Sequence, residues 1–237
     1  MAQRPKEHVR SGFVAAASSL FAEVGFEVTT MAAIAERAGS SIGNMYKYFA
    51  SKDDLLRAVL PAEFAREVER MTEARIKALG KARDVRLLAP GDRYHVLAGE
   101  LFDHCLAHRE RIVILLGRPE GTPFATFPVD FRKKLVAWAL DYVRHAWPEV
   151  RPRASMRFAL DRIYDSYLAA IATTFAALRK PRAIRDAVAH LTAHHQGGLK
   201  ALFEAGAGAA RADQEGGREK RRGRKGGPKE RKGGKHA

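Results

Sequence analysis

The chain has 237 residues, of which 46% are hydrophobic, so it is long enough and apolar enough to bury a sizeable core. Its formal net charge is +15 and its pI is about 10.2, which indicates a polyanionic partner, either nucleic acid or an anionic membrane surface. The charge is uneven, because eleven Lys/Arg and four Asp/Glu lie from Arg211 onward, a net +7 that leaves +8 on the first 210 residues. We therefore expect the folded part to be basic even without its tail.

A single cysteine, Cys105, excludes a disulfide within the chain and fits a reducing cytosol. The basic residues 1–12 are not followed at once by an apolar segment of the secretory type. The longest weakly polar run, Leu168 to Leu178, is interrupted by two threonines and is far shorter than the roughly 20 residues that a membrane span needs. These features predict a soluble, cytoplasmic protein without a membrane partner.

The first helix is predicted to have one apolar face, with residues spaced i, i+4, i+7, i+8 and i+11: Phe13, Ala17, Leu20, Phe21 and Val24. Gly25 ends this helix, because glycine readily adopts the left-handed conformation of a helix end. Thr30 is a good N-cap for a second helix, and Gly39 ends that helix. Ser41 is a candidate N-cap for a third helix, whose inner residues are expected to be Ile42, Met45 and Phe49.

The stretch 29–52 therefore contains two short helices joined by a tight turn. Its second helix places Asn44, Tyr46, Lys47 and Tyr48 on a polar, aromatic and basic surface. A helix-turn-helix unit presents its recognition helix to a DNA groove in this way.

Beyond this unit the chain is again predicted to be helical. A long helix is expected from Ser51 to Gly80, kinked at Pro61. Five further helices are expected at about 94–108, 109–116, 131–147, 153–178 and 182–205. No segment shows sustained strand alternation or paired hairpin signals, so the fold class is all-α with about nine helices. After Gly206 the composition is mostly Gly, Lys, Arg and Glu, which predicts a disordered basic tail over 206–237.

The first 60 residues resemble the N-terminal domain of the TetR/AcrR family of transcriptional regulators. The resemblance is long, ordered and without gaps, and covers about a quarter of the chain. The residues that carry it are Ala16-Ala17, Leu20-Phe21, Gly25-Phe26, Thr30, Ile34-Ala35, Ala38-Gly39-Ser40-Ser41, Gly43, Tyr46, Tyr48-Phe49, Ser51-Lys52 and Leu55-Leu56. The resemblance implies a three-helix DNA-binding domain over 1–57 and a helical ligand-binding and dimerisation domain over 58–205.

The resemblance further implies a homodimer on a palindromic operator, released from double-stranded DNA when a small ligand enters the C-terminal domain. It implies dimer contacts through the helices at about 153–178 and 182–205. The residues implied or suggested for DNA contact are Thr30, Ser41, Ile42, Gly43, Asn44, Tyr46, Lys47, Tyr48 and Lys52. Tyrosine and lysine suit phosphate contacts, Asn44 suits an adenine edge, and Ile42 suits a thymine methyl group if it is not in the core.

Large residues between 94 and 175 predict either a packed core or an apolar ligand pocket. The candidates for a pocket lining are Phe102, Leu106, Phe131, Trp138, Tyr142, Tyr164 and Tyr167. The histidines at 104 and 108 share a helix face around Cys105, but zinc needs three or four ligands, so we expect no metal site. A second group, His190, His194 and His195, is expected on an exposed or subunit-facing edge, where it would make dimerisation pH-dependent if it lies at the interface.

No Gly-rich phosphate loop and no paired carboxylates in an apolar setting are present, so neither an enzyme nor a cofactor is expected. The sequence favours a ligand-responsive repressor that is cytoplasmic and associated with the bacterial nucleoid. An architectural, nucleoid-type DNA-binding protein without an effector is the alternative, in which the basic tail from Arg211 dominates through salt-sensitive contacts. The tail could instead bind RNA or simply be solvated.

Overall fold

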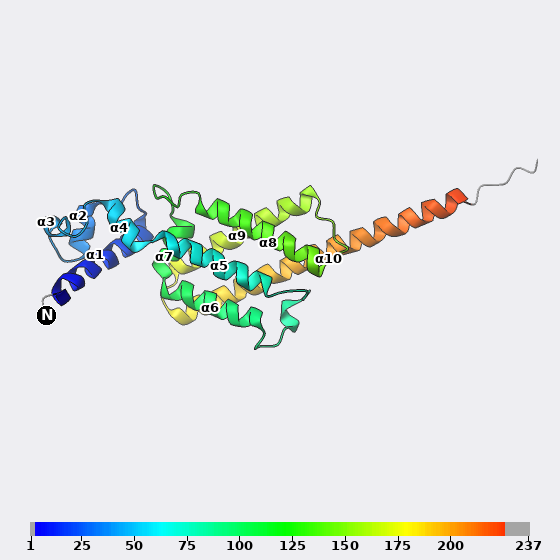
Figure 1. The fold of residues 1–237 in the computed structure, drawn as a ribbon, viewed down its shortest axis with the longest axis horizontal. Coiled ribbons are helices and arrows are strands. Elements are labelled where there is room, and N and C mark those ends of the chain that lie inside the picture. The colour runs from blue at the N-terminus through cyan, green and yellow to red at the C-terminus, as the bar shows by residue number, and fades with distance from the viewer. Residues whose placement is uncertain (1–2, 226–237) are drawn as a thin grey trace, which may run out of the picture.

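The computed structural model describes the backbone of residues 3–225 and the side chains of residues 6–212, and this part contains helices and no strand. Helices α1–α4 form one end of an elongated molecule, α5–α9 with the first half of α10 form a bundle beside it, and α10 continues outward at the opposite end (Figure 1). The elements are α1 (Gln3–Val24), α2 (Met31–Arg37), α3 (Ile42–Met45), α4 (Lys52–Val59), α5 (Ala62–Lys77), the 3₁₀ helix η1 (Val85–Leu87), α6 (Arg93–Ala107), α7 (Arg109–Gly117), α8 (Phe127–Ala146), α9 (Ala154–Ala177) and α10 (Pro181–Lys225).

The described residues form ten α-helices, close to the nine or so expected, and the long helix expected from Ser51 to Gly80 is two helices. Leu60 leaves the helical conformation with φ −128° and ψ 81°, and Pro61 becomes the N-cap of α5. A proline disfavours the α conformation in the residue before it and has no N–H to donate, so the chain breaks here instead of kinking. The domain boundary predicted at residue 57 lies inside α4. The interruption between α4 and α5 lies three residues later, at Leu60.

The N-terminal helices pack around aromatic and aliphatic side chains predicted from the spacing, among them Phe13, Phe21, Ile34 and Met45, all fully buried. One residue of the predicted apolar face of α1 is misplaced, because Val24 at the end of that helix is 45% exposed. The buried apolar cluster is continuous from α1 to α10, so the two ends of the molecule share one core.

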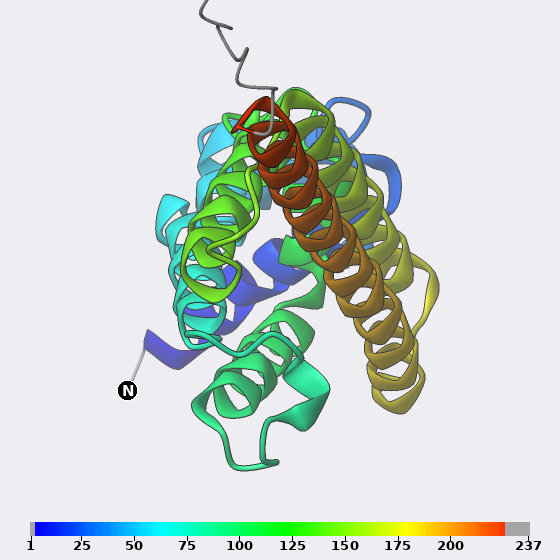
Figure 2. The same cartoon turned by 90° about the vertical axis from the view of Figure 1, so that its right-hand side faces the viewer.

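Helices α6 and α7 differ sharply in how they are covered. Four consecutive residues of α7, Ile112 to Leu115, are buried, so this short helix is enclosed on all sides. Within α6, Tyr94 is the one residue classed as buried, although the helix carries a predicted apolar face. Viewed along the long axis, α6 lies at one edge of the bundle, away from the layer of α8 and α9 (Figure 2). The inner face of α6 is therefore only partly filled by neighbours.

The last helix extends beyond residue 205, where the sequence predicted its end. Ala207 is buried, and a Cβ on Gly206 would lie 2.7 Å from the Cε of Met156, so both residues pack against the bundle. Helix α10 then runs on to Lys225, and the rest of the predicted disordered tail, 226–237, lies outside the described residues. None of the described helices is long and apolar enough to cross a membrane.

Candidate nucleic-acid interface and ligand cavity

The turn between α2 and α3 is fixed by side-chain caps and one glycine. Thr30 Oγ1 accepts a hydrogen bond from the Ala33 N–H at 3.1 Å, which caps α2. Ser41 Oγ accepts one from the Asn44 N–H at 3.2 Å, which caps α3. Gly39 between them has φ +65°, a conformation that residues with a Cβ rarely adopt. The sequence therefore encodes the two helices and the angle between them through local interactions.

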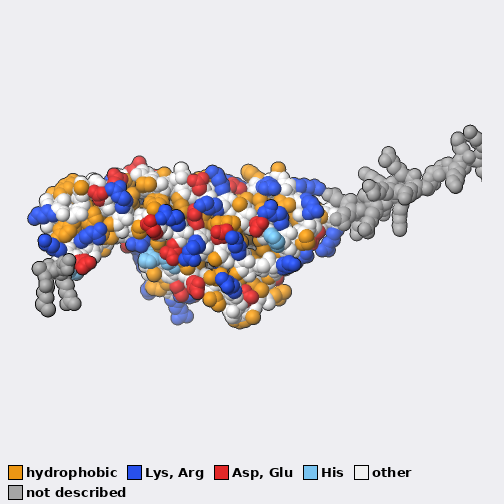
Figure 3. All heavy atoms as spheres, viewed as in Figure 1, with side chains coloured by type: hydrophobic (Ala, Val, Ile, Leu, Met, Phe, Trp, Pro, Cys, Tyr) orange, Lys and Arg blue, Asp and Glu red, His pale blue; other side chains and the backbone are white. Residues whose placement is uncertain are grey.

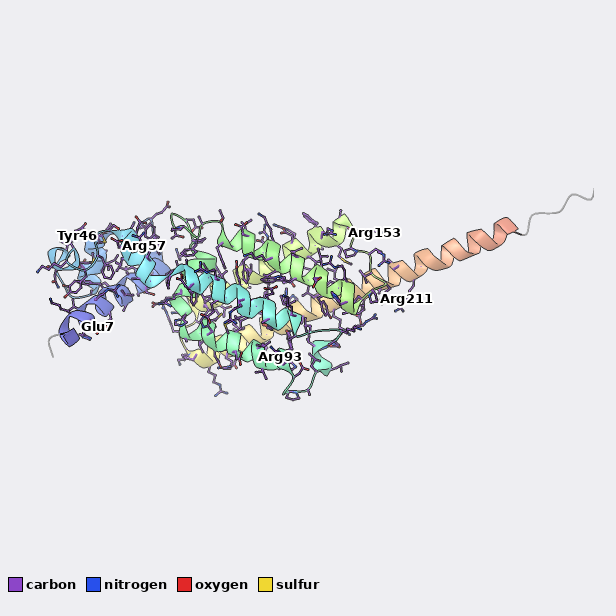
Figure 4. The ribbon with its side chains drawn as sticks, in the orientation of Figure 1. Glu7, Tyr46, Arg57, Arg93, Arg153 and Arg211 are labelled. Atoms are coloured by element: carbon purple, nitrogen blue, oxygen red, sulfur yellow. The ribbon has the colours of Figure 1, made fainter. Side chains whose placement is uncertain are left out.

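Most of the predicted DNA-contact residues are exposed around α3. Thr30, Ser41, Gly43 and Lys47 are exposed, and the side chains of Ile42 and Tyr46 are 44% and 52% exposed. Ile42 is thus outside the core, contrary to its expected inner position, and is free to contact another molecule. Tyr46 lies at the end of the molecule opposite the α10 extension (Figure 4). Basic and hydrophobic side chains lie next to one another at this end (Figure 3).

Asn44 and Tyr48 are half-buried, because both contact their own domain. The Asn44 side-chain amide donates to Ser40 Oγ at 3.0 Å, and the Tyr48 ring packs 5.8 Å from that of Phe13. These contacts hold the two side chains at the edge of the exposed surface. Phe49, the last predicted inner residue, is buried as expected.

Lys52 is held inside the domain. Its ammonium group donates hydrogen bonds to the carbonyl oxygens of Phe26, Glu27 and Thr29 at 2.7, 3.1 and 2.8 Å. It also lies 4.4 Å from the centre of the Phe26 ring. All three ammonium hydrogens are thereby engaged, so a phosphate contact by Lys52 would require some of these bonds to break.

The sequence interpretation did not single out Arg10, which lies next to the recognition unit. Its guanidinium carbon is 5.0 Å from the centre of the Phe49 ring, and the residue is exposed. The basic first turns of α1 were the signal that could have indicated it. A cation held beside α3 is well placed to contact a phosphate.

A cavity of about 410 Å³ lies within the bundle, lined by α5 to α10. Four of the seven predicted pocket residues line it: Phe102, Phe131, Tyr164 and Tyr167. Tyr142 lines a smaller adjoining cavity, Trp138 lines a surface hollow near α5, and Leu106 packs against the core without lining either cavity. The aliphatic part of the main cavity is formed by Val68, Leu101, Ile112, Leu116, Leu135, Leu168, Ile171 and Val188.

Arg75 places a charged side chain at the inner end of this cavity. It was not among the residues predicted from the sequence. Arg75 lines both the main cavity and the adjoining cavity, and protein surrounds it on all other sides. Part of its side chain is accessible to solvent, because it faces these two cavities. Phe64, Val68, Thr72 and Arg75 fall on one face of α5, so a cation within an apolar helix stripe was the available signal.

Aromatic and polar side chains surround the arginine. The Gln196 amide donates to the Tyr94 hydroxyl at 2.6 Å, and the hydroxyls of Tyr167 and Thr192 lie 2.8 Å apart. Burial raises the pKa of Tyr164, so its hydroxyl is neutral near neutral pH.

His195 is buried within the bundle and not on the exposed or subunit-facing edge predicted for it, whereas His190 and His194 are exposed. Its ring stacks on that of Tyr167 with centres 4.1 Å apart and lies 5.0 Å from that of Tyr164. Burial, together with the charge of Arg75, lowers the pKa of His195 to about 4. It is therefore a neutral member of the group around Arg75.

The first pair of histidines, His104 and His108, also packs against other side chains. The rings of His104 and His108 are 5.0 Å apart, and both contact Phe64. Burial raises the pKa of the Cys105 thiol to about 12, so the thiol is protonated. Across the part of the chain described here, no three His, Cys, Asp or Glu side chains are grouped as a metal site requires.

Helix α7 connects the cavity to the DNA-binding end. Ile112 and Leu116 line the cavity, whereas Val113 faces α1, where it lines a hollow together with Ser19 and Ala22 between the two packed helices. A movement of the α7 wall would therefore act directly on α1.

The loop between α7 and α8 makes a second connection to the N-terminal end. Gly121 has φ +70°, and a Cβ placed on it would lie 2.3 Å from the Cγ of Glu27, in the segment between α1 and α2. Both routes join the cavity-bearing bundle to the segments that support α3.

Comparison with known proteins agrees with this geometry. Residues 13–59 match the profile of the bacterial regulatory proteins of the tetR family. The chain is 34% identical over 92 residues to the fatty acid metabolism regulator protein of Bacillus subtilis (strain 168), which covers 39% of this chain and 45% of that protein. It is 37% identical over 73 residues to the HTH-type transcriptional regulator HbdR of Aromatoleum sp. (strain CIB), covering 28% of this chain and 32% of that protein. The matched segments thus span less than half the length of these curated relatives.

The fold is similar to the crystal structure of a TetR-family transcriptional regulator from Bordetella parapertussis 12822. The TM-score is 0.50 at 19% sequence identity, and the alignment covers 78% of this chain and 94% of that one. Residues 13–59, which contain the capped helix-turn-helix at 30–49, thus match the tetR family of bacterial regulatory proteins, and the fold as a whole is similar to that of a TetR-family regulator.

Proposed function

We propose that this protein is a transcriptional repressor that binds a palindromic operator as a homodimer and leaves it when a small, largely apolar ligand fills the cavity. The observation that carries the ligand response is the position of α7, which lines the cavity with Ile112 and Leu116 and packs on α1 with Val113. The protein would act in the bacterial cytoplasm on nucleoid DNA, as a regulator and not as an enzyme.

DNA binding would be carried by the exposed residues of the α3 turn. Tyr46 and Lys47 suit phosphate contacts, which fix the register of a protein on the duplex without reading its sequence. Ile42 and Asn44 would read base edges, a thymine methyl group and an adenine respectively. Thr30 and Ser41, at the N-termini of α2 and α3, would add phosphate contacts through their exposed hydroxyls.

Dimerisation would place two copies of α3 in successive major grooves, about 34–36 Å apart. The predicted interface helices, α9 and α10, each have an exposed face suited to close packing. Phe158 on α9 is 69% exposed, and on α10 Ala193, Gly197 and Ala201 form an exposed row of small residues at i, i+4 and i+8. Small residues of this kind permit close approach of two helices.

The ligand would act by moving α7 and the loop around Gly121, and so the tilt of α1 and α3. The relative from Bacillus subtilis is named a fatty acid metabolism regulator, and an apolar effector for this chain would agree with that name. The aliphatic lining of the cavity supports the same ligand class.

The proposal is tested by selecting bound fragments from genomic DNA and mapping the protected sequence. A repressor should protect a palindrome and prefer it to random DNA by roughly a thousandfold or more at physiological salt. Apolar compounds that raise the unfolding temperature should then reduce operator binding. Binding without sequence preference would contradict the proposal and favour the architectural alternative.

Deleting residues 211–237 separates these two functions. A repressor should keep its operator preference and lose mainly non-specific, salt-sensitive binding when the net +7 of this segment is removed. An architectural protein should lose most of its DNA affinity. Unchanged salt dependence after the deletion would show that the tail does not bind DNA.

A further inference from the structure

Arg75 is a buried cation without a counter-charge. Its Nε has no hydrogen-bond partner. Burial acts to lower the pKa of Arg75, but the neighbouring Tyr94, Tyr167 and Tyr164, with a hydrogen bond to Tyr167, raise it overall, and no carboxylate is among these causes. The guanidinium keeps its charge at any physiological pH. Burying a charge is costly unless it is paired, so this position lowers the stability of the empty protein.

The other charges near this end of the cavity already have partners. Asp84, which lines the adjoining cavity, accepts hydrogen bonds from Arg86 and forms an ion pair with Lys200 at 3.3 Å. Arg83 in the same cavity pairs with Glu149 at 3.0 Å. Arg75 therefore contributes one positive charge that no carboxylate among the described residues neutralises.

The rest of the main cavity is mainly apolar and long, and its second arginine, Arg185, is already paired with Asp103. Tyr164 and Phe175 both line it, and their separation along α9 corresponds to about 16 Å of helix. At the opposite end from Arg75, the ring centres of Phe102 and Phe175 lie 6.4 Å apart, and Leu116 of α7 also lines the cavity. A ligand bound at Arg75 could thus extend its apolar part along α9 to the helix that contacts α1.

We propose that the cavity binds an amphipathic monocarboxylate, with its carboxylate paired to Arg75 and its hydrocarbon chain directed toward α7. This inference rests on the proposed function, because it names the ligand class of the same cavity. A single unpaired guanidinium matches a single negative charge, and its planar fork suits both oxygens of a carboxylate. Hydroxyl and amide groups of Tyr94, Tyr164 and Gln196 surround the place where the carboxylate would lie.

Entry would take place between α6 and α10. Polar contacts join these helices on either side of the cavity: Gln196 to Tyr94 at 2.6 Å, and Arg185 to Asp103 at 2.9 Å. The second contact is exposed, and Arg185 also covers the Phe102 ring at 4.5 Å. Since most of α6 is only half-buried, separation of these contacts would expose the cavity at little cost.

The decisive experiment compares ligands of equal chain length and different head group by titration calorimetry with the full chain. The probes are dodecanoate, dodecanol, dodecylamine and dodecyl phosphate. Wild-type protein should bind dodecanoate at least tenfold more tightly than dodecanol, since a hydrogen-bonded charge pair contributes at least that much. Equal binding of dodecanoate and dodecanol would overturn the proposal, as would tighter binding of dodecyl phosphate, which would indicate a dianionic head group.

Two substitutions show whether Arg75 is the cause of the preference. Arg75→Met should abolish the preference for the carboxylate and bind dodecanol as wild type does, whereas Arg75→Lys should keep part of the preference. The control Arg66→Met, on the exposed face of the same helix and outside the cavity, should leave the preference unchanged. Arg75→Met should also raise the unfolding temperature of the ligand-free protein, because it removes an unpaired buried charge. A fall in that temperature would assign Arg75 a structural role and overturn the proposal.

The outcomes separate this inference from the proposed function. If dodecanol binds and releases the operator as efficiently as dodecanoate, the repressor function stands and the carboxylate proposal fails. If dodecanoate binds through Arg75 without affecting operator binding, the ligand class is supported and the repressor mechanism fails. Butanoate provides a further check, since its chain is too short to reach α7 and it should bind weakly without releasing DNA.

Discussion

The DNA-binding end of this molecule and its helical bundle differ in whether their polar side chains have partners. At the DNA-binding end, side chains cap α2 and α3, and the Lys52 ammonium donates to three backbone carbonyls. In the bundle, the Arg75 guanidinium has no carboxylate partner, and α6 has one buried residue, Tyr94, within the described structure. The first region is complete by itself, whereas the second leaves space and charge that a ligand can fill.

This difference suits the two roles. A recognition helix must hold its shape before it meets DNA, so its supporting contacts are made within the domain. A ligand can shift an equilibrium only through interactions that differ between two states. An unfilled cavity beside an enclosed helix, α7, provides such an interaction, because a bound ligand would touch lining side chains that otherwise face the open space of the cavity.

The largest expected difference in stability comes from truncating one phenylalanine in each of the two regions. Phe13 is fully buried at the DNA-binding end, so Phe13→Ala should lower the free energy of unfolding by about 3–5 kcal/mol. Phe102 is half-buried in the cavity wall, so Phe102→Ala should cost about 1 kcal/mol. Urea unfolding followed by circular dichroism measures both values. Equal losses would show that the cavity wall is packed as tightly as the N-terminal core.

The second test uses the pH dependence that burial, together with the charge of Arg75, imposes on His195. The folded pKa is lowered to about 4 from the ordinary value of 6.5, with Arg75, His194 and the rings of Tyr164 and Tyr167 facing the imidazole. The unfolded chain therefore binds more protons between these values, so stability is complete above pH 6.5 and falls as the pH is lowered toward 4. The loss should be of the order of 2–3 kcal/mol.

The matched variant for this test is His195→Gln. Its unfolding free energy, measured by urea titration at pH 7.5 and pH 5, should fall less than that of the wild type between the two conditions. The neighbouring exposed histidine gives the control, since His194→Gln should retain most of the wild-type loss. Parallel curves for wild type and His195→Gln would mean that His195 protonates without strain and that this end of the bundle is open to water.

The same contrast explains what could be predicted from the sequence. Caps and turns depend on neighbouring residues, so Thr30, Gly39 and Ser41 were recognisable from their types and spacing. The exposure of Ile42 was not, because a one-turn helix provides too little periodicity to assign a face. Arg75 lies on an apolar helix face, but the cavity next to it depends on how far apart α5, α6 and α10 pack, which no local pattern encodes.

The length of α10 is a related case. The low apolar content after Gly206 predicts a segment without a core of its own, but the helix end predicted at residue 205 is too early, because Gly206 and Ala207 still pack on the bundle and the Ala, Arg, Glu and Lys that follow have high helix propensity. Composition alone therefore indicates whether a segment can build a core, not whether it continues a helix that has already formed.

The smallest expected effects distinguish two lysines of the DNA-binding end. Lys52→Met keeps an unbranched side chain of similar length but removes three hydrogen bonds and the cation's contact with the Phe26 ring. It should therefore lower stability by about 1–2 kcal/mol, and operator affinity should fall only as far as folding does. Lys47→Ala removes an exposed cation, so it should leave stability unchanged, weaken binding to all sequences alike and reduce the salt slope of log K by about 1. Lys133→Ala, an exposed lysine of α8, is the control that should change neither. If Lys52→Met instead reduced the salt slope by one at unchanged stability, Lys52 would have to leave its carbonyl partners to bind a phosphate. The DNA-binding end would then also change its internal contacts on binding its ligand.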